Sequence, residues 1–139
     1  MTALELLIKL IKHFEGCKLK AYYCPAGVLT CGWGSTGKDI LPNTVWTQEY
    51  ADKRLMHDAV HFLQATQKLC PNLEGEQLGA IADFAYNLGI GRLKSSTLRK
   101  KLNEGDFESA SRELKKWVNG GGKKLNGLVA RRDAEAEYL

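Results

Sequence analysis

The segment EGCKLKAYYCPAGVLTCGWGST, from Glu15 to Thr36, decides the organisation of this chain. It begins with a carboxylic acid directly after an apolar helical stretch, and a Cys-Pro-Ala-Gly turn then joins two short β-prone runs. Cys24 follows Glu15 by nine residues, and Thr30 follows Cys24 by six. Everything after Trp46 has a helical pattern. We therefore expect the chemistry in this early segment and its structural support in the rest of the chain.

An amphipathic helix is predicted directly before this segment. Apolar residues recur every three or four positions over residues 3–14, which is the spacing of one helix face. Thr2 and Glu5 have the spacing of a capping box, and Gly16 is suited to end the helix. Glu15 then lies in the last turn, where the terminal carbonyl groups and apolar neighbours disfavour a negative charge. The carboxyl group is biased toward the protonated form that a general acid requires, unless it is an ordinary exposed glutamate.

A β-hairpin is predicted from the change of pattern after this helix. Residues 21–23 and 28–31 are β-prone, and residues 24–27 place proline and glycine where a reversing turn needs them. In such a hairpin Cys24 and Thr30 come from facing strands and can approach one site.

The fold class indicated is α+β, predominantly α. A single domain over residues 1–139 is expected, with a mixed lobe at about 15–46 and a helical lobe at about 47–139 that includes helix 2–14. No uncharged apolar run is long enough to span a bilayer, and the N-terminus lacks the layout of a signal peptide. Further helices are predicted at residues 48–69 with Thr47 as N-cap and Tyr50 buried, at 77–88 ended by the Gly89-Ile90-Gly91 break, and at 96–103, 107–118 and 128–138.

The net charge of +4 is concentrated late in the chain. From Arg92 onward there are twelve Lys or Arg against seven Asp or Glu. Such a surplus favours a polyanionic partner, although a solvated helix face explains it as well. A basic helical domain that binds nucleic acid is one alternative, but the interleaved aromatic residues or recognition helix expected of it are absent. No nucleic-acid partner is therefore expected.

Several separated motifs resemble the phage-type lysozymes, a family of glycoside hydrolases also called endolysins. They are CPAGVLTCGWGSTG, FAYNLGIG, SSTLRKKLNEGDF and KKLNGLVARR, and the similarity runs from about Leu4 to Leu139. The resemblance implies a small N-terminal β-hairpin lobe packed against a larger helical lobe. It also implies a muramidase that hydrolyses the β-1,4 bond between N-acetylmuramic acid and N-acetylglucosamine in peptidoglycan. A glycan-binding module without activity is the alternative within this family.

The resemblance assigns catalytic roles to three residues of the early segment. Glu15 matches the acid, Thr30 matches the catalytic threonine that positions water, and Cys24 matches the second catalytic group. Many members have aspartate at this last position. Because an ordinary thiol has a pKa of about 8.5, the choice of base and the stereochemistry of the product stay open. No cofactor or metal is implied.

Other positions resemble residues that line or support the family's glycan site. Tyr86, Asn87, Ser96 and Thr97 match residues that contact the glycan, with core packing as the alternative for Tyr86. Either Arg131 or Arg132 matches the arginine that pairs with the catalytic acid. Many members have histidine where Ser35 stands, so a supporting ion pair is expected to be absent there.

The four cysteines permit three complete pairings. In some exported phage lysozymes a disulfide blocks the active site until thiol exchange frees it, and Cys17 and Cys24 match that arrangement. We therefore predict that a Cys17–Cys24 disulfide can block the site under oxidising conditions. The alternative is four reduced thiols, with Cys31 and Cys70 buried as small apolar residues. A monomer made in the bacterial cytoplasm and acting on the cell wall in the periplasm is expected, with an export route that this chain does not encode.

Overall fold

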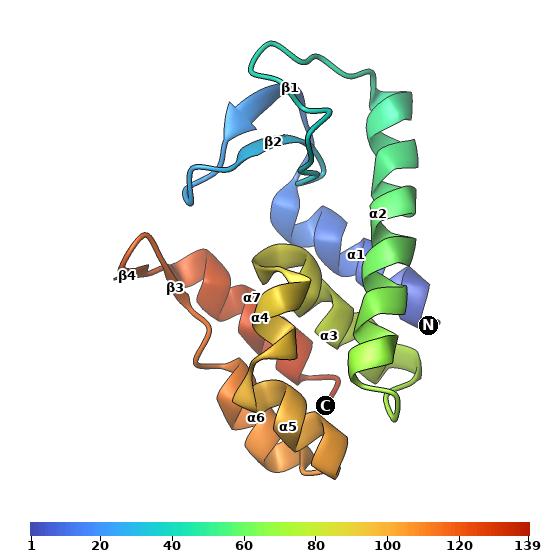
Figure 1. The fold of residues 1–139 in the computed structure, drawn as a ribbon, viewed down its shortest axis with the longest axis vertical. Coiled ribbons are helices and arrows are strands. Elements are labelled where there is room, and N and C mark those ends of the chain that lie inside the picture. The colour runs from blue at the N-terminus through green and yellow to red at the C-terminus, as the bar shows by residue number, and fades with distance from the viewer.

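A computed structural model describes all residues from Met1 to Leu139. The chain forms a short β-hairpin, a set of helices and a second, very small hairpin near its C-terminal end (Figure 1). The elements in chain order are α1 (Ala3–Glu15), β1 (Lys18–Tyr23), β2 (Leu29–Gly32), α2 (Gln48–Leu69), α3 (Gly75–Leu88), α4 (Ile90–Lys94), α5 (Thr97–Glu104), α6 (Phe107–Leu114), β3 (Asn119–Gly120), β4 (Lys123–Lys124) and α7 (Asn126–Ala136).

Helix α1 ends at the residue that the sequence singles out as the acid. The predicted capping box is confirmed: the Thr2 hydroxyl accepts from the Glu5 amide, and the Glu5 carboxylate accepts from the Thr2 amide, both at 3.1 Å. Glu15 is the last helical residue, and Gly16 follows with φ of 68°, a backbone conformation that favours glycine. The helix therefore delivers the Glu15 side chain to the junction with the hairpin.

The predicted hairpin is confirmed, although β1 begins three residues before the β-prone run at 21–23. Strands β1 and β2 pair antiparallel, with Tyr22 opposite Thr30 and Lys18 opposite Gly32. The register shifts between these two pairs, so the middle of β1 bulges away from β2. Lys20 in that bulge bridges instead to Val45 of the following loop. The loop thereby covers the free side of β1.

Helix α3 is the centre of the helical part. It packs against α1, α2, α4 and α7, and most of its residues are buried. Gly79 permits the close approach of α1, because a Cβ atom there would lie 2.6 Å from the Ala3 carbonyl oxygen of α1. Figure 1 shows α2 running along one side from the level of the hairpin to the level of α3, with α5 and α6 beyond its lower end.

Three details differ from the sequence predictions. The stretch after Gly89, predicted as a break, forms the short helix α4. The helix predicted at 107–118 is shorter, because α6 ends at Leu114, and the segment between α6 and α7 forms the paired strands β3 and β4. Tyr50, predicted as buried in α2, is 47% exposed. Its ring lies in the first turn of the helix and packs against Trp46. Thr47 caps α2 as predicted.

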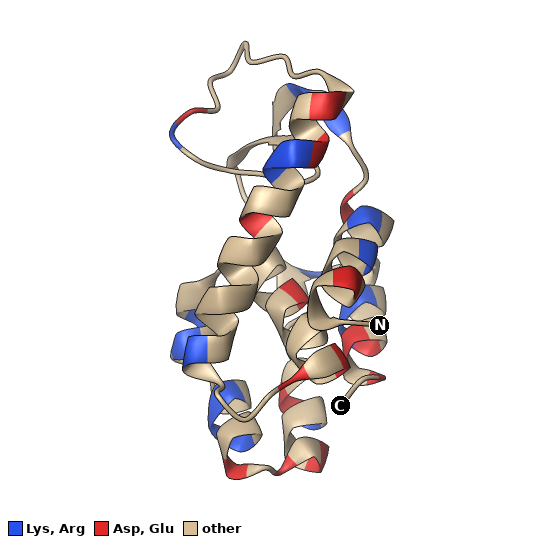
Figure 2. Cartoon of the chain, turned by 90° about the vertical axis from the view of Figure 1, so that its right-hand side faces the viewer, with Lys and Arg blue, Asp and Glu red and all other residues tan.

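Basic and acidic residues are interspersed on the helices in Figure 2. Several form exposed pairs within one helix, such as Lys53 with Glu49 and Arg112 with Glu108. Exposed pairs of this kind contribute little to stability. None of the helices combines the length and the apolar character that crossing a bilayer requires.

Candidate active site

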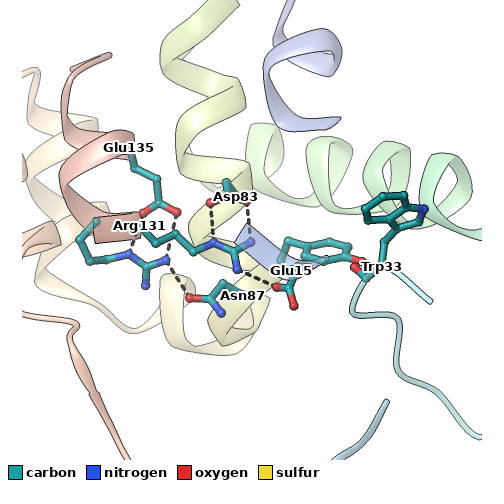
Figure 3. A network of polar contacts seen from close by, with 8 residues as sticks. Glu15, Trp33, Asp83, Asn87, Arg131 and Glu135 are labelled. Atoms are coloured by element: carbon teal, nitrogen blue, oxygen red, sulfur yellow. Dashed lines mark hydrogen bonds and ion pairs between the residues drawn. The ribbon is translucent and has the colours of Figure 1, made fainter. Parts of the chain in front are cut away.

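Glu15 is held by an arginine that reaches it from the C-terminal helix. The Arg131 Nη1 group lies 2.7 Å from Oε2 of Glu15, and the other side of the guanidinium donates two bonds of 2.8 Å to Asp83 (Figure 3). The side chains of Arg131 and Asp83 are 5% and 0% exposed, whereas that of Glu15 is 19% exposed. Arg131 and Asp83 are therefore buried, whereas the Glu15 carboxylate is accessible from solvent.

The backbone of the turn after β2 closes the other side of the glutamate. A Cβ atom added to Gly34 would lie 2.6 Å from Oε1 of Glu15, and the Gly34 φ is +87°. Only glycine allows the chain to pass so close in this conformation. Oε1 has no hydrogen-bond partner in the protein, whereas Oε2 is bound by Arg131. One carboxylate oxygen is thus fixed and the other is free for chemistry.

The hairpin carries the two other residues predicted to be catalytic. The Thr30 side chain is nearly buried, and its hydroxyl donates to the Val28 carbonyl at 2.8 Å. Cys24 is half-buried at the start of the turn, where its amide donates to the same carbonyl. Tyr22 stands opposite Thr30 and two residues before Cys24, so the three share one face of the hairpin.

Tyr22 is a residue of the hairpin that sequence reasoning did not single out. Burial raises the pKa of the Tyr22 hydroxyl, and the negative charge of Glu15 raises it further. The meeting of Glu15, Cys24 and Thr30 at one site stays a prediction.

Tyr86 has a supporting position. Its hydroxyl donates to the Trp33 carbonyl at 2.7 Å, and its ring packs edge to face against Phe62. Burial, the main cause, raises the pKa of this hydroxyl. The Trp33 indole in turn donates to Asp52 at 2.8 Å. These contacts favour core packing, the alternative to glycan contact, and fix the turn that precedes Gly34.

The two neighbouring arginines divide their contacts. Arg131 pairs with the acid, whereas the Nη2 group of Arg132 donates to Oδ1 of Asn87 at 2.8 Å and to Glu135 at 3.0 Å. The Arg132 Nε atom is also 2.8 Å from a Glu135 oxygen, although poorly aligned for a hydrogen bond, and Nη1 has no partner. Of the two alternatives, Arg131 is the arginine that contacts Glu15, whereas the Arg132 guanidinium contacts Asn87 and Glu135.

The environment of Glu135 favours its protonated form. Burial raises the pKa of Glu135 well above its usual range, and its hydrogen bond to Asp83 raises it further. Burial alone would raise the pKa of Asp83 too, but hydrogen bonds from Glu135 and Arg131 outweigh burial and lower it.

The remaining predicted glycan contacts lie at the start of α5. Ser96 is the N-cap of this helix: its hydroxyl accepts from the Arg99 amide at 3.0 Å and donates to the Leu93 carbonyl at 2.7 Å. Thr97 is exposed in the first turn. No contact joins either residue to Glu15 or to the hairpin, so their role in glycan binding stays a prediction.

Ser35 takes part in a different arrangement from the ion pair that its position suggests. Its buried hydroxyl donates to Asp58 at 2.7 Å. The ion pair with Asp58 comes instead from Arg54 of the same helix, at 3.0 Å, and Arg54 also pairs with Asp39 and donates to the Thr36 carbonyl. Asp58 is therefore paired with a cation, Arg54, although residue 35 carries no charge.

All four cysteines are free thiols in this structure. Cys31 and Cys70 are buried, as the reduced alternative predicts, and burial raises the pKa of each, that of Cys70 to about 11. Cys17 and Cys24 stand at opposite ends of β1, which places them roughly 20 Å apart, whereas a disulfide needs Cα atoms about 4.4–6.8 Å apart. The predicted Cys17–Cys24 bridge would require β1 to leave the hairpin.

Sequence reasoning missed Asp83 and Glu135, which position the arginines. Asp83 stands in an otherwise apolar stretch of α3, between Ala82 and Phe84. A carboxylate at such a position has to be paired with a buried cation. That signal was readable in the sequence, but the identity of the partner was not.

A sequence profile of the family described as phage lysozyme matches residues 12–135. The chain belongs to the phage lysozyme family. It is 44% identical over 131 residues to the endolysin of Bacillus phage B103, which covers 92% of this chain and 50% of that protein. The chain thus spans about half the length of that relative. The SAR-endolysin of bacteriophage PS119 is 36% identical over 124 residues, which covers 88% of this chain and 74% of that protein.

Solved structures of phage lysozymes and related domains share the fold. The endolysin from Escherichia coli O157:H7 phage FAHEc1 has a TM-score of 0.80 at 31% identity, over 99% of this chain and 92% of that one. The muramidase domain of SpmX from Asticaccaulis excentricus has a TM-score of 0.82 at 28% identity, over 95% and 92%. The predicted family and its fold, a small hairpin with a larger set of helices, are confirmed.

Proposed function

We propose that this chain is a muramidase that hydrolyses the β-1,4 bond between N-acetylmuramic acid and N-acetylglucosamine in bacterial peptidoglycan. The observation that carries the proposal is the position of Glu15, with one oxygen fixed by Arg131 and the other free beside Gly34. Membership of the phage lysozyme family supports it.

Glu15 is the proton donor in this proposal. Cleavage of a glycosidic bond needs a proton on the leaving oxygen and a nucleophile at the sugar carbon. Oε1 of Glu15 is the oxygen that carries the proton, because Oε2 accepts from Arg131. Asp83 keeps the guanidinium in place through two hydrogen bonds, so the acid is positioned before substrate arrives.

Thr30 positions the attacking water. Its hydroxyl proton is directed to the Val28 carbonyl, so the oxygen lone pairs remain to accept a hydrogen bond from water. Cys24 shares this face of the hairpin and acts as the second catalytic group. A thiolate there accepts a proton from the water or stabilises positive charge on the sugar.

The cell wall in the periplasm is the proposed place of action, with host lysis as its role. Relatives at 36% and 34% identity are SAR-endolysins of bacteriophages PS119 and PA-2. The basic surplus of the C-terminal part agrees with attraction to an anionic wall.

Loss of turbidity from a suspension of purified peptidoglycan tests the proposal. The wild-type chain is expected to clear the suspension, and Glu15→Gln is expected to abolish clearing while its circular dichroism stays unchanged. Binding without clearing by the wild-type chain identifies a glycan-binding module instead. Binding to duplex DNA but not to peptidoglycan identifies the basic nucleic-acid-binding domain.

The products identify the bond that is cut. Mass analysis should find fragments with muramic acid at the reducing end, and the same digestion in heavy-oxygen water should add the label to that end. Fragments without the label would point to internal transfer within the sugar and contradict hydrolysis.

A further inference from the structure

Arg132 and Glu135 form a fully buried pair that does not touch the proposed acid. Both side chains are 0% exposed, and Arg132 also lies 5.1 Å above the Phe84 ring. A buried pair of charged residues can often be replaced by apolar residues without loss of stability. Stability alone therefore does not explain this pair, and Arg132 also donates a hydrogen bond to Oδ1 of Asn87 at 2.8 Å.

This contact fixes which way the Asn87 amide points. A guanidinium group has only N–H donors, so the Asn87 atom that faces Arg132 is Oδ1, the acceptor. The amide Nδ2 group is consequently directed away from Arg132. It has no hydrogen-bond partner in the protein, and Asn87 is half-buried. Two N–H donors are thus held free.

The free amide lies on the same side as the free oxygen of the acid. Asp83 and Asn87 are four residues apart on α3 and share one face of the helix. Arg131 links Asp83 to Glu15, so Glu15 stands beside that face. Figure 3 shows the Asn87 nitrogen and the unbound Glu15 oxygen pointing toward the same side of the network.

We propose that Arg132, held by Glu135, is a positioning residue that presents the Asn87 amide as a fixed donor to an acetamido carbonyl oxygen of the glycan. This proposal rests on the proposed function. Sugar hydroxyl groups both donate and accept, so they would bind either end of the amide. An acetamido carbonyl oxygen only accepts hydrogen bonds. It therefore binds best when the Asn87 amide is held with its N–H groups toward the sugar. The fixed orientation of the Asn87 amide makes this position selective for N-acetylated sugars.

Binding of tetra-N-acetylchitotetraose to full chains that carry Glu15→Gln tests the proposal without catalysis. Asn87→Asp preserves the acceptor for Arg132 but has no donor, so Kd should rise about tenfold. Arg132→Met with Glu135→Leu removes the pair together and frees the amide to rotate, so Kd should rise about three- to tenfold. Calorimetry measures both values.

A further variant separates positioning from general structure. Once Asn87→Ala is present, adding Arg132→Met and Glu135→Leu should change Kd by less than about twofold, because the pair no longer has an amide to orient. The matched control is Arg112→Met with Glu108→Leu, which makes the same substitutions at an exposed ion pair and should leave Kd unchanged.

The proposal is overturned if adding Asn87→Asp to the Glu15→Gln chain leaves the Kd for the tetrasaccharide unchanged. It is also overturned if the changes in binding free energy caused by Arg132→Met with Glu135→Leu and by Asn87→Ala simply add. Absence of tetrasaccharide binding by the Glu15→Gln chain overturns it too. If the double variant does not fold, Asn87→Asp decides alone, because it preserves the contact with Arg132. Clearing of peptidoglycan by the wild-type chain tests the proposed function separately.

Discussion

The Arg131 guanidinium stands between Glu15 and Asp83, donating 2.7 Å and 2.8 Å hydrogen bonds to them. Asp83 is the more deeply buried partner and takes two of the three bonds. The position of the acid is therefore determined by a residue of α3 that does not contact it. This relation connects the stability of the helical core to the geometry of the site.

Asp83→Asn should destabilise the chain by about 3–5 kcal/mol, because it leaves Arg131 buried with one remaining anionic partner. The folded-state pKa of Asp83 is lowered, so its stabilising effect is present above the unfolded value and is lost as pH falls through the folded value. Urea unfolding of wild type and variant from pH 2 to 7 measures this. A difference in stability that does not shrink toward low pH would contradict the assignment.

Glu135→Gln should leave stability at pH 5 almost unchanged and increase it at pH 8. Because the folded-state pKa of Glu135 is raised, its contribution is full below the unfolded value and is lost as pH rises toward the folded value. Glutamine keeps a donor for Asp83 and has no proton to lose. Thermal unfolding across this range should give a flatter profile for the variant. Equal profiles would show that Glu135 is ionised in the folded chain.

Gly34→Ala should lower muramidase activity at least tenfold, because the new methyl group would take the space of the Glu15 carboxylate. Gly27→Ala is the matched control. Gly27 has a similar φ of +80°, but nothing lies within 4 Å of its added Cβ. Both variants should lose about 1 kcal/mol of stability from backbone strain. The activity of the control should stay within about twofold of wild type, and an equal loss in both would exclude the contact with Glu15 as the cause.

Cys17 and Cys24 should react with iodoacetamide at pH 8 much faster than Cys31 and Cys70. Burial raises the pKa of the second pair and so reduces the reactive thiolate. Peptide mass mapping after short labelling times measures the order. Labelling of all four at one rate would indicate that the folded chain opens readily.

Formation of the Cys17–Cys24 disulfide should depend on the state of β1. Oxidised glutathione added to the folded chain should leave activity intact, because the strand separates the two thiols. Refolding in the same buffer should yield a bridged, less active form that reductant restores. Cys17→Ser should abolish this loss. Inactivation of the folded chain within minutes would show that β1 leaves the hairpin easily.

The sequence by itself determined the elements and their order. The capping box at Thr2 and Glu5, the turn after Cys24 and the cap at Thr47 are local signals, and each depends on contacts within four residues. Periodicity also predicted helix α1 and its buried face, because one apolar face is encoded by spacing alone. The sequence did not predict the short helix α4 or the hairpin β3–β4, because their glycine-containing segments are compatible with many turns.

Only the tertiary structure decided which side chains meet. Arg131 and Arg132 are adjacent and alike in sequence, yet the first binds Glu15 and the second binds Asn87. The separation between Glu15 and Arg131 is 116 residues, and no local pattern encodes it. It is the packing of α1 and α7 on α3 that brings the charges together, and burial then requires each to find a partner.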